Sequence, residues 1–348
     1  MKEEVLKYLK EQNDYVSGEQ ISKKLGVTRA SIWKIINKLK EEGYMIESST
    51  KKGYKLTQIP NIITKEEVQS IIKTQCLGRN MHYFSEIDST NEEVKKLART
   101  GEAEGVTVVA DKQTAGKGRL GRVWNSPSGN NIFMSVLLRP RIKPEKASQI
   151  TLIAGLAMCE AIREVTGLEA KIKWPNDIVV NGKKVCGILT EMSAEIDCVN
   201  YVVVGIGVNV NQTEFPEELP YATSLKLQGG QEYQRGKIIG VFFDKFEPYY
   251  MAYKENTTLE LMLPAYKRYC ITLDDKVKII DSVNEYIAEP LDVLADGSLV
   301  VRTEVGEEKR IFTGEVSVRG TFRLKNYKQI KNGYIIINRI YMDLKYEI

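Results

Sequence analysis

Residues 113–124 combine glycines and cations at spacings suited to binding an anion. The segment reads Gln-Thr-Ala-Gly-Lys-Gly-Arg-Leu-Gly-Arg-Val-Trp, so three glycines alternate with three cations and an indole follows. Glycines let backbone amides approach an anion closely, and Lys and Arg supply charge-assisted hydrogen bonds. The indole of Trp124 offers a flat apolar face to a planar ring. The Walker pattern Gly-x-x-x-x-Gly-Lys-Ser/Thr is absent. We therefore expect a loop that binds a phosphate or an acyl-phosphate, with a solvated surface turn as the alternative.

Three further motifs follow this loop and one precedes it. They read Lys-Ile-Lys-Trp-Pro-Asn-Asp at 171–177, Gly-Lys-Lys-Val-Cys-Gly-Ile-Leu at 182–189, Val-Val-Val-Gly-Ile-Gly-Val-Asn at 202–209 and Asp-Ser-Thr-Asn at 88–91. In this order they resemble the biotin protein ligase family. The N-terminal segment makes the resemblance strongest to the bifunctional members, which are biotin ligases and repressors of the biotin operon. The resemblance extends over residues 1–320.

The resemblance implies a group of side chains that binds biotin. A neutral ureido ring suits hydroxyl and amide partners better than charged ones, whereas the loop cations would lie along the acyl-phosphate. Residues 89–91 also precede a predicted helix, so they could cap that helix and bind the ligand as well. The implied biotin-binding residues are Ser89, Thr90, Asn91, Gln113, Lys117, Gly118, Arg119 and Lys184.

Two of these residues are implied to be catalytic. Arg119 would neutralise the reacting phosphate. Lys184 would lie between the biotin carboxylate and the α-phosphate and stabilise negative charge as the two join. Its neighbour Lys183 is the solvated alternative. Lys117 stands where some relatives have arginine, so the charge is kept but bidentate geometry is lost.

A second group is implied to bind ATP and the adenylate. Trp124 would pack over the adenylate, with a place in the core as the alternative. Asp177 would help hold Mg²⁺ or orient Lys173. One carboxylate is too few for a dedicated metal cage, so Mg²⁺ is expected to arrive with ATP. Cys186 is expected to pack in the core and not to act as a nucleophile. The implied nucleotide-binding residues are Arg122, Trp124, Lys173, Asn176, Asp177, Asn209 and Arg319.

These residues imply an ATP-dependent ligase that works in two steps. Biotin would be activated as biotinyl-5′-AMP and then transferred to a lysine of a biotin carboxyl carrier domain of a carboxylase. The other expected partners are operator DNA of biotin genes and, when ligand is bound, a second copy of the chain. The alternatives are a biotin-sensing repressor without ligase activity and a lipoate or octanoate ligase of similar fold.

Residues 1–60 predict a winged helix-turn-helix domain. Three amphipathic helices with Leu25-Gly26-Val27 as the turn precede two short strands, and the third helix would enter the major groove. A protein-interaction helix bundle is the alternative. An exposed indole is unusual on a helix that contacts DNA bases. The alternative for Trp33 is therefore that it packs beneath the wing. The expected DNA-binding residues are Gly18, Thr28, Arg29, Ser31, Trp33, Lys34, Asn37, Lys51 and Lys52.

The chain as a whole is expected to belong to the α+β class. Residues 61–269 mix strands and helices without strict alternation, which indicates a mixed α/β domain. The resemblance implies that this domain is the catalytic domain of a biotin ligase. Short strands over 270–320 suggest a small β-barrel, which the resemblance makes SH3-like. Residues 321–348 depart from the family pattern as an added hairpin or a basic tail, and no role is assigned to them.

Charge and cysteine usage limit the class of protein further. Residues 1–60 hold 12 Lys and Arg against 8 Asp and Glu, whereas 61–320 hold 32 against 36, so a polyanion partner is expected for the first part only. The five cysteines are widely spaced and form no Cys-x-x-Cys pair, which argues against disulfides or structural zinc and favours a reducing cytoplasm. From the lack of a long apolar run and the charged start Met1-Lys2-Glu3-Glu4, neither a membrane span nor a secretion signal is expected.

Overall fold

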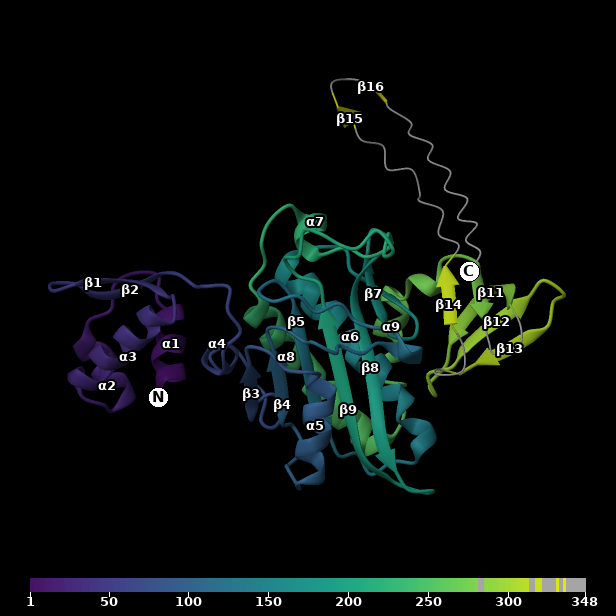
Figure 1. Cartoon of the computed structure of the whole chain (residues 1–348), viewed down its shortest axis with the longest axis horizontal. Helices are drawn as coiled ribbons and strands as arrows, with labels where there is room; N and C mark the ends of the chain where they lie inside the picture. The colour runs from purple at the N-terminus through teal and green to yellow at the C-terminus, as the bar shows by residue number, and fades with distance from the viewer. Residues whose placement is uncertain (281–284, 313–316, 321–329, 332–333, 336–348) are drawn as a thin grey trace.

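The computed structural model consists of an N-terminal helical domain, a central domain built on one large sheet, and a small C-terminal sheet (Figure 1). No helix in the described part of the chain is both long and apolar enough to cross a membrane. The structure describes residues 1–280, 285–312, 317–320, 330–331 and 334–335.

The N-terminal domain has the expected winged helix-turn-helix order. Its elements are α1 (Lys2–Lys10), α2 (Gly18–Leu25), α3 (Arg29–Glu41), β1 (Met45–Ser49) and β2 (Gly53–Gln58). The two strands pair in antiparallel fashion and form the wing. Apolar residues spaced three or four apart on the helices are buried together, so each helix contributes one face to a shared core.

Local sequence sets the ends of α2 and α3. The Ser17 hydroxyl accepts a hydrogen bond from the Gln20 amide while the Gln20 side chain accepts one from the Ser17 amide, which is a capping box. Gly26 ends α2 in the left-handed region with φ +67°, where a side chain would be strained. Thr28 caps α3 by accepting from the Ser31 amide. The turn between the two helices therefore follows from a few residues near it.

Buried polar groups join the N-terminal domain to the central domain. The Lys10 ammonium lies 2.7 Å from the carboxylate of Glu67 in α4 (Lys65–Gln69), and the Tyr44 hydroxyl donates to the same carboxylate at 2.8 Å. Glu67 is 2% exposed, and burial lowers the pKa of Lys10 and raises that of Tyr44. Separating these groups would leave a buried charge unpaired, so the contact fixes how the domains meet. α4 itself is a short helix of five residues.

The central domain is built on a seven-stranded sheet with the order β3-β4-β5-β9-β8-β7-β6. Only β3 and β4 are parallel, and every other pair of neighbours is antiparallel. The sheet is therefore mixed, as the α+β expectation requires. The strands are β3 (Met81–Phe84), β4 (Thr107–Ala110), β5 (Ile132–Leu138), β6 (Lys171–Lys173), β7 (Asp177–Val180), β8 (Lys183–Ala194) and β9 (Val199–Val208).

Helices cover both faces of this sheet. α5 (Thr90–Arg99) packs on one face, where Leu137 joins its apolar cluster, and α6 (Ser148–Thr166) lies with α8 (Arg235–Asn256) on the other, where Val136 is buried. Adjacent residues of β5 thus face opposite helical layers, and the strand is buried along its whole length. Long buried strands with helices on both sides give a rigid platform for the loops at the strand ends.

The C-terminal domain is a five-stranded antiparallel sheet with the order β13-β12-β11-β10-β14, which confirms the expectation of a small β domain. β15 (Ile330–Lys331) pairs with β16 (Tyr334–Ile335), while the rest of residues 321–348, where a hairpin or a basic tail was expected, lies outside the described residues. The remaining helices and strands are α7 (Leu225–Gly229), α9 (Leu263–Tyr269), β10 (Val277–Ile280), β11 (Glu285–Val293), β12 (Leu299–Thr303), β13 (Glu308–Ile311) and β14 (Ser317–Gly320).

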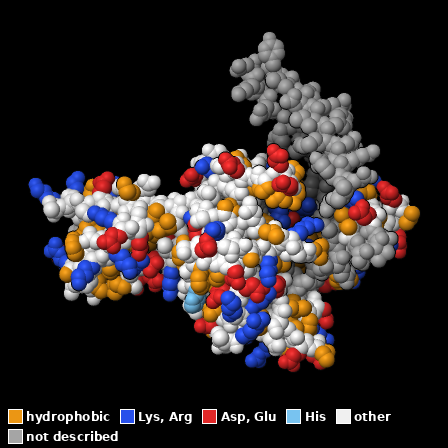
Figure 2. All heavy atoms as spheres, in the orientation of Figure 1, with side chains coloured by type: hydrophobic (Ala, Val, Ile, Leu, Met, Phe, Trp, Pro, Cys, Tyr) orange, Lys and Arg blue, Asp and Glu red, His pale blue; other side chains and the backbone are white. Residues whose placement is uncertain are grey.

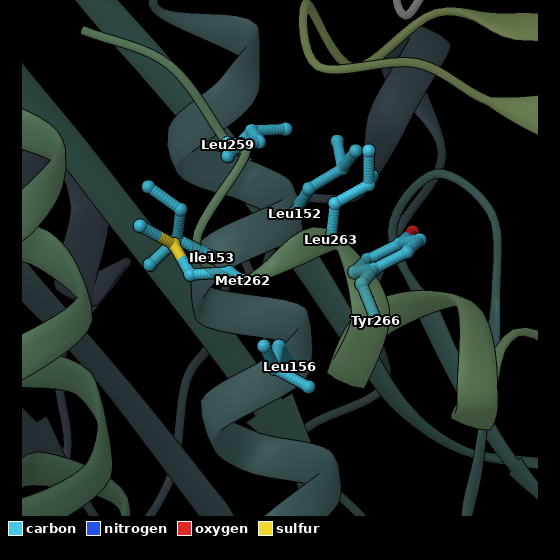
Figure 3. Close-up of a pocket in the computed structure, with 7 residues that line it drawn as sticks. All are labelled: Leu152, Ile153, Leu156, Leu259, Met262, Leu263 and Tyr266. Carbon is cyan, nitrogen blue, oxygen red and sulfur yellow. The ribbon is translucent and has the colours of Figure 1, made fainter. Parts of the chain in front are cut away.

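A small apolar cavity lies between α6, α9 and the segment before α9 (Figure 3). Its volume is about 10 Å³, and the Tyr266 hydroxyl beside it is buried with no hydrogen-bond partner in the described part of the chain. A space of this size with an apolar lining holds one water at most. The cavity is a packing gap between helices. It is lined by Leu152, Ile153, Leu156, Leu259, Met262, Leu263 and Tyr266.

Trp174 connects the central domain to the C-terminal sheet. Its side chain is 1% exposed, and its indole Nε1 donates to the Gly297 carbonyl at 3.1 Å. Its backbone amide donates to the Thr272 hydroxyl at 2.9 Å. The motif at 171–177 is therefore bonded to the C-terminal part of the chain through both the backbone and the side chain of Trp174.

Replacing Trp174 with Phe should lower the free energy of unfolding by about 1–3 kcal/mol, because the Gly297 carbonyl would lose its donor inside the protein. Urea denaturation followed by circular dichroism measures the change. Trp33→Phe is the matched control, since Trp33 is 57% exposed and its loss should change stability little. Equal denaturation midpoints for wild type and Trp174→Phe would contradict the role given to this ring.

Candidate active site

One pocket collects the residues expected to bind biotin. It lies between the start of α5, the glycine loop and the strands β8 and β9, so its walls come from segments distant in sequence. All eight expected biotin-binding residues line it, together with Trp124 and Asn176. The lining residues are Ser89, Thr90, Asn91, Gln113, Lys117, Gly118, Arg119, Trp124, Asn176, Lys184, Gly187, Ile188, Leu189, Gly205, Ile206 and Gly207.

A chain of hydrogen bonds orients the neutral side chains of the pocket. The Thr90 amide and hydroxyl donate to the Gln113 carboxamide oxygen at 2.9 and 3.1 Å. The Ser135 hydroxyl contacts the Thr90 hydroxyl at 2.7 Å and the Asn91 carboxamide oxygen at 2.5 Å. Ser89 stands at the N-cap position of α5 without a side-chain capping bond. Sequence reasoning missed Ser135, because only its place on β5 brings it beside α5.

The glycine loop folds back on itself at the pocket mouth. The Gly118 amide donates to the Arg122 carbonyl at 2.7 Å, and the Trp124 amide donates to the Gly116 carbonyl at 2.9 Å. The Lys117 ammonium lies 2.6 Å from a carboxylate oxygen of Glu92 on α5. The loop is thus a short hairpin with one cation tied to the helix beside the pocket. Glu92 was not foreseen, because no local pattern pairs it with a loop 25 residues away.

The two cations expected to be catalytic each contact a group of the 171–177 motif. The Arg119 guanidinium donates to the Asn176 carboxamide oxygen at 2.7 Å, and the Lys184 ammonium lies 2.7 Å from an Asp177 carboxylate oxygen. Burial lowers the pKa of Arg119, an effect that the charge of nearby Asp177 opposes. Both contacts are to oxygens that a ligand carboxylate or phosphate could replace without leaving the cation unpaired. Both cations are therefore already in place to bind an anionic ligand group.

Glycines in the strands make room for the Trp124 ring. A Cβ atom at Gly207 would lie 2.5 Å from the indole Cε2, and one at Gly187 would lie 2.8 Å from Cζ3. The Lys184 ammonium is 5.3 Å from the ring centroid, a cation–π contact. The Gly-x-Gly spacing at 205–207 is typical of a bend, but both of these glycines lie within strand β9, where they let other side chains approach closely. At Gly205 a Cβ would lie 2.1 Å from the Asn91 side-chain oxygen.

Among the other expected nucleotide-binding residues whose side chains are described, none lines the pocket: these are Arg122, Lys173, Asp177 and Asn209. Arg122 is exposed at the loop, and Lys173 on β6 pairs in register with Asp177 on β7. Asn209 is buried, and its side-chain nitrogen Nδ2 donates to the Thr223 carbonyl at 3.0 Å. Arg319 pairs through its backbone with the residue opposite it on β10, and its side chain lies outside the described part of the structure.

The described residues contain no dedicated metal cage. No group of three or more His, Cys, Asp or Glu side chains in the described ranges is arranged to hold an ion. Asp177 offers a single carboxylate, which already contacts Lys184. Cys186 is completely buried, and burial raises the pKa of its thiol well above the usual range, which agrees with a packing role.

The N-terminal domain exposes several of the residues expected to contact DNA. Arg29, Trp33 and Lys34 are exposed on α3, and cationic side chains appear over this end of the molecule (Figure 2). Trp33 therefore does not pack beneath the wing. The residues Lys51 and Lys52 are exposed at the wing tip. Other expected residues serve the fold or are half-buried: Thr28 and Ser31 form the α3 cap, and Gly18 and Asn37 are half-buried.

The fold and the pocket define the class of acyl ligases that act on proteins. Residues 83–209 match the model of the biotin/lipoate A/B protein ligase family, and residues 2–55 match that of an HTH domain. The first match contains every residue that lines the pocket, and the second contains the exposed face of α3.

Full-length relatives narrow this class. The bifunctional ligase/repressor BirA of Bacillus subtilis is 38% identical over 311 residues, covering 88% of this chain and 94% of the relative. The protein of the same name from Escherichia coli is 28% identical over 308 residues, covering 88% and 94%. The structure of a biotin protein ligase from Aquifex aeolicus in complex with biotin and ATP is 32% identical, with a TM-score of 0.61 and coverage of 70% and 100%. The chain belongs to the family of bifunctional biotin ligase/repressors.

The contact between Lys117 and Glu92 should depend on pH in a defined direction. Hydrogen bonds from Lys117 and Lys95 lower the pKa of the Glu92 carboxyl from 4.5 to about 2. Because the pKa is lower in the folded protein, these contacts stabilise it fully above pH 4.5 and progressively less as the pH falls towards about 2.

Thermal unfolding of wild type and Glu92→Gln at a series of pH values measures this dependence. The difference in unfolding midpoint should be constant at neutral pH and shrink below pH 4.5. A difference that stays the same down to acid pH would show that the carboxylate is not held by these lysines.

Proposed function

We propose that this chain is an ATP-dependent biotin–protein ligase that also represses transcription by binding DNA. The observation that carries the proposal is the pocket itself, in which eight expected biotin-binding residues lie together and two cations face its interior. The Aquifex aeolicus relative, described in complex with biotin and ATP, supports the choice of both ligands.

In the first step the biotin carboxylate attacks the α-phosphate of ATP. A bond forms between the carboxylate oxygen and phosphorus, pyrophosphate leaves, and biotinyl-5′-AMP remains. Lys184 would exchange Asp177 for the oxygens of the joining groups, and Arg119 would exchange Asn176 for the phosphate. Positive charge fixed beside developing negative charge lowers the barrier, and it does so more strongly where water is excluded.

In the second step a lysine of a biotin carboxyl carrier domain attacks the mixed anhydride. Its uncharged ε-amine forms an amide with the biotin carbonyl, loses a proton, and AMP leaves. The hairpin of the glycine loop would cover the adenylate until then, since Lys117 and Trp124 contact groups on different walls of the pocket. Exclusion of water protects the anhydride from hydrolysis.

The residues present fit Mg²⁺ that enters with ATP. Asp177 is one carboxylate already shared with Lys184, so the phosphate oxygens would supply most of the ligands. Bound in this way, the ion would neutralise charge on the triphosphate. Asp177 would then orient Lys184 or contribute one oxygen to the ion.

The repressor part of the proposal depends on the N-terminal domain. Exposed cations on α3 and on the wing suit the phosphates of operator DNA. An ordered loop over the adenylate would favour pairing of two copies of the chain, which would set two winged helices on neighbouring half-sites. A repressor without ligase activity would not need Lys184 and Arg119 in one pocket. The match to the bifunctional relatives favours biotin over lipoate or octanoate.

Lys184→Ala should slow transfer of biotin to a carrier domain by about a hundredfold or more, because a charge beside the reacting oxygens is lost. Lys183→Ala is the matched control: it removes the same charge one residue away, from an exposed side chain outside the pocket. Incorporation of labelled biotin into a carrier domain measures both. Equal rates for Lys184→Ala and wild type would refute the site, and parallel assays with lipoate and octanoate test the alternative substrates.

Arg29→Ala should weaken binding to duplex DNA and reduce the dependence of log Kd on log salt by about one unit, because one phosphate contact would be lost. Fluorescence anisotropy with a labelled duplex over a range of salt concentrations measures the slope. Lys96→Ala, an exposed charge change on α5 of the central domain, should leave the slope unchanged. An Arg29→Ala slope equal to that of wild type would count against DNA contact through α3.

A further inference from the structure

Arg235 is a buried arginine that holds three separate segments. It is 3% exposed at the start of α8. One terminal nitrogen donates to the Asp111 carboxylate at 2.8 Å and to the Asn131 carbonyl at 3.0 Å, and the other donates to the Asn61 carbonyl at 2.7 Å. A planar guanidinium makes such bonds in fixed relative directions, so the three segments are fixed relative to one another.

Two of these partners mark the ends of the ligand loop. Asp111 follows strand β4 and Asn131 precedes β5, so everything between them, including the glycine loop, starts and ends at this guanidinium. Asp111 also accepts from the Ser128 hydroxyl. Burial alone would raise the pKa of Asp111, but the hydrogen bonds from Ser128 and Arg235 outweigh it and hold that pKa below its usual value. The carboxylate therefore stays charged.

The third partner, Asn61, lies in the linker of residues 59–64, between β2 of the winged helix and α4. The Asn61 carboxamide oxygen accepts from the Arg235 backbone amide and Nε, both at 3.3 Å, and the Asn61 side-chain nitrogen Nδ2 donates to the Tyr233 carbonyl at 3.2 Å. Gln234 contacts the same linker separately. Its side-chain nitrogen Nε2 donates to the Ile59 carbonyl at 3.2 Å, a bond in which the Arg235 guanidinium takes no part.

We propose that Arg235 is a positioning residue that couples the ligand loop to the linker of the DNA-binding domain. The importance of this coupling for ligand binding rests on the proposed function, because residues 112–130 would cover the adenylate. The coupling itself is inferred only from the hydrogen bonds of Arg235. A buried guanidinium cannot lose one partner without a large cost, so a shift of the loop base or of the linker changes the bonds on the other side.

Amide hydrogen exchange in the ligand-free protein tests the coupling directly. Asn61→Ala, made in the linker, should speed exchange of amides in residues 112–130 by about threefold or more, although it touches none of them. Asp111→Asn, made at the loop base, should speed exchange of linker amides by a similar factor. Arg235→Lys keeps the charge but loses the forked donors of the guanidinium, and it should speed exchange in both segments.

Gln234→Ala is the matched control, because it removes a linker hydrogen bond that bypasses the guanidinium. It should speed exchange in the linker only. If Asn61→Ala and Asp111→Asn likewise change only their own segments, the coupling does not exist. Should Arg235→Lys fail to fold, the other two variants carry the test, with circular dichroism to confirm that they are folded.

A transfer assay then separates this inference from the proposed function. In Asn61→Ala the KM for biotin should rise about threefold while kcat stays close to wild type, since the loop is loosened and its cations are intact. An unchanged KM together with altered loop exchange would overturn the positioning role in catalysis. Absence of biotin transfer by the wild-type chain would instead overturn the proposed function, and the exchange result would stand by itself.

Discussion

The candidate site depends on two cations that are held beside strand glycines, which leave room for the Trp124 ring. Arg119 and Lys184 keep contact with Asn176 and Asp177, while the indole of Trp124 lies against Gly207. A cation in a partly buried pocket is costly without a partner, so each must have an acceptor when no ligand is present. The acceptors in the 171–177 motif meet that need. The carboxylate and phosphate oxygens of a ligand could take their places, so that neither cation would be left without an acceptor.

Buried polar contacts also connect the three parts of the chain. Glu67 joins the winged helix to the central domain, Arg235 joins the linker to the ligand loop, and Trp174 joins the 171–177 motif to the C-terminal sheet. Such contacts are directional, and breaking one leaves an unpaired group inside the protein. The domains are therefore set at fixed orientations, whereas apolar packing alone would tolerate sliding.

Local sequence predicted the features that local chemistry determines. The bounds of α2 follow from a cap at Ser17 and a left-handed glycine at its end, and the pocket residues belong to contiguous motifs. Features that depend on distant segments were missed. Ser135, Glu92 and Arg235 acquire their partners only when strands and helices pack together. The glycines of β9 suggested a bend because sequence alone cannot distinguish a turn glycine from one that admits a side chain from across the fold.

The most direct test of the central claim is a crystal structure of the chain with biotinyl-5′-AMP. The account predicts the adenylate in the pocket, with the Lys184 ammonium and the Arg119 guanidinium bonded to its carbonyl and phosphate oxygens in place of Asp177 and Asn176. An adenylate bound elsewhere, with both cations still on their present partners, would contradict it.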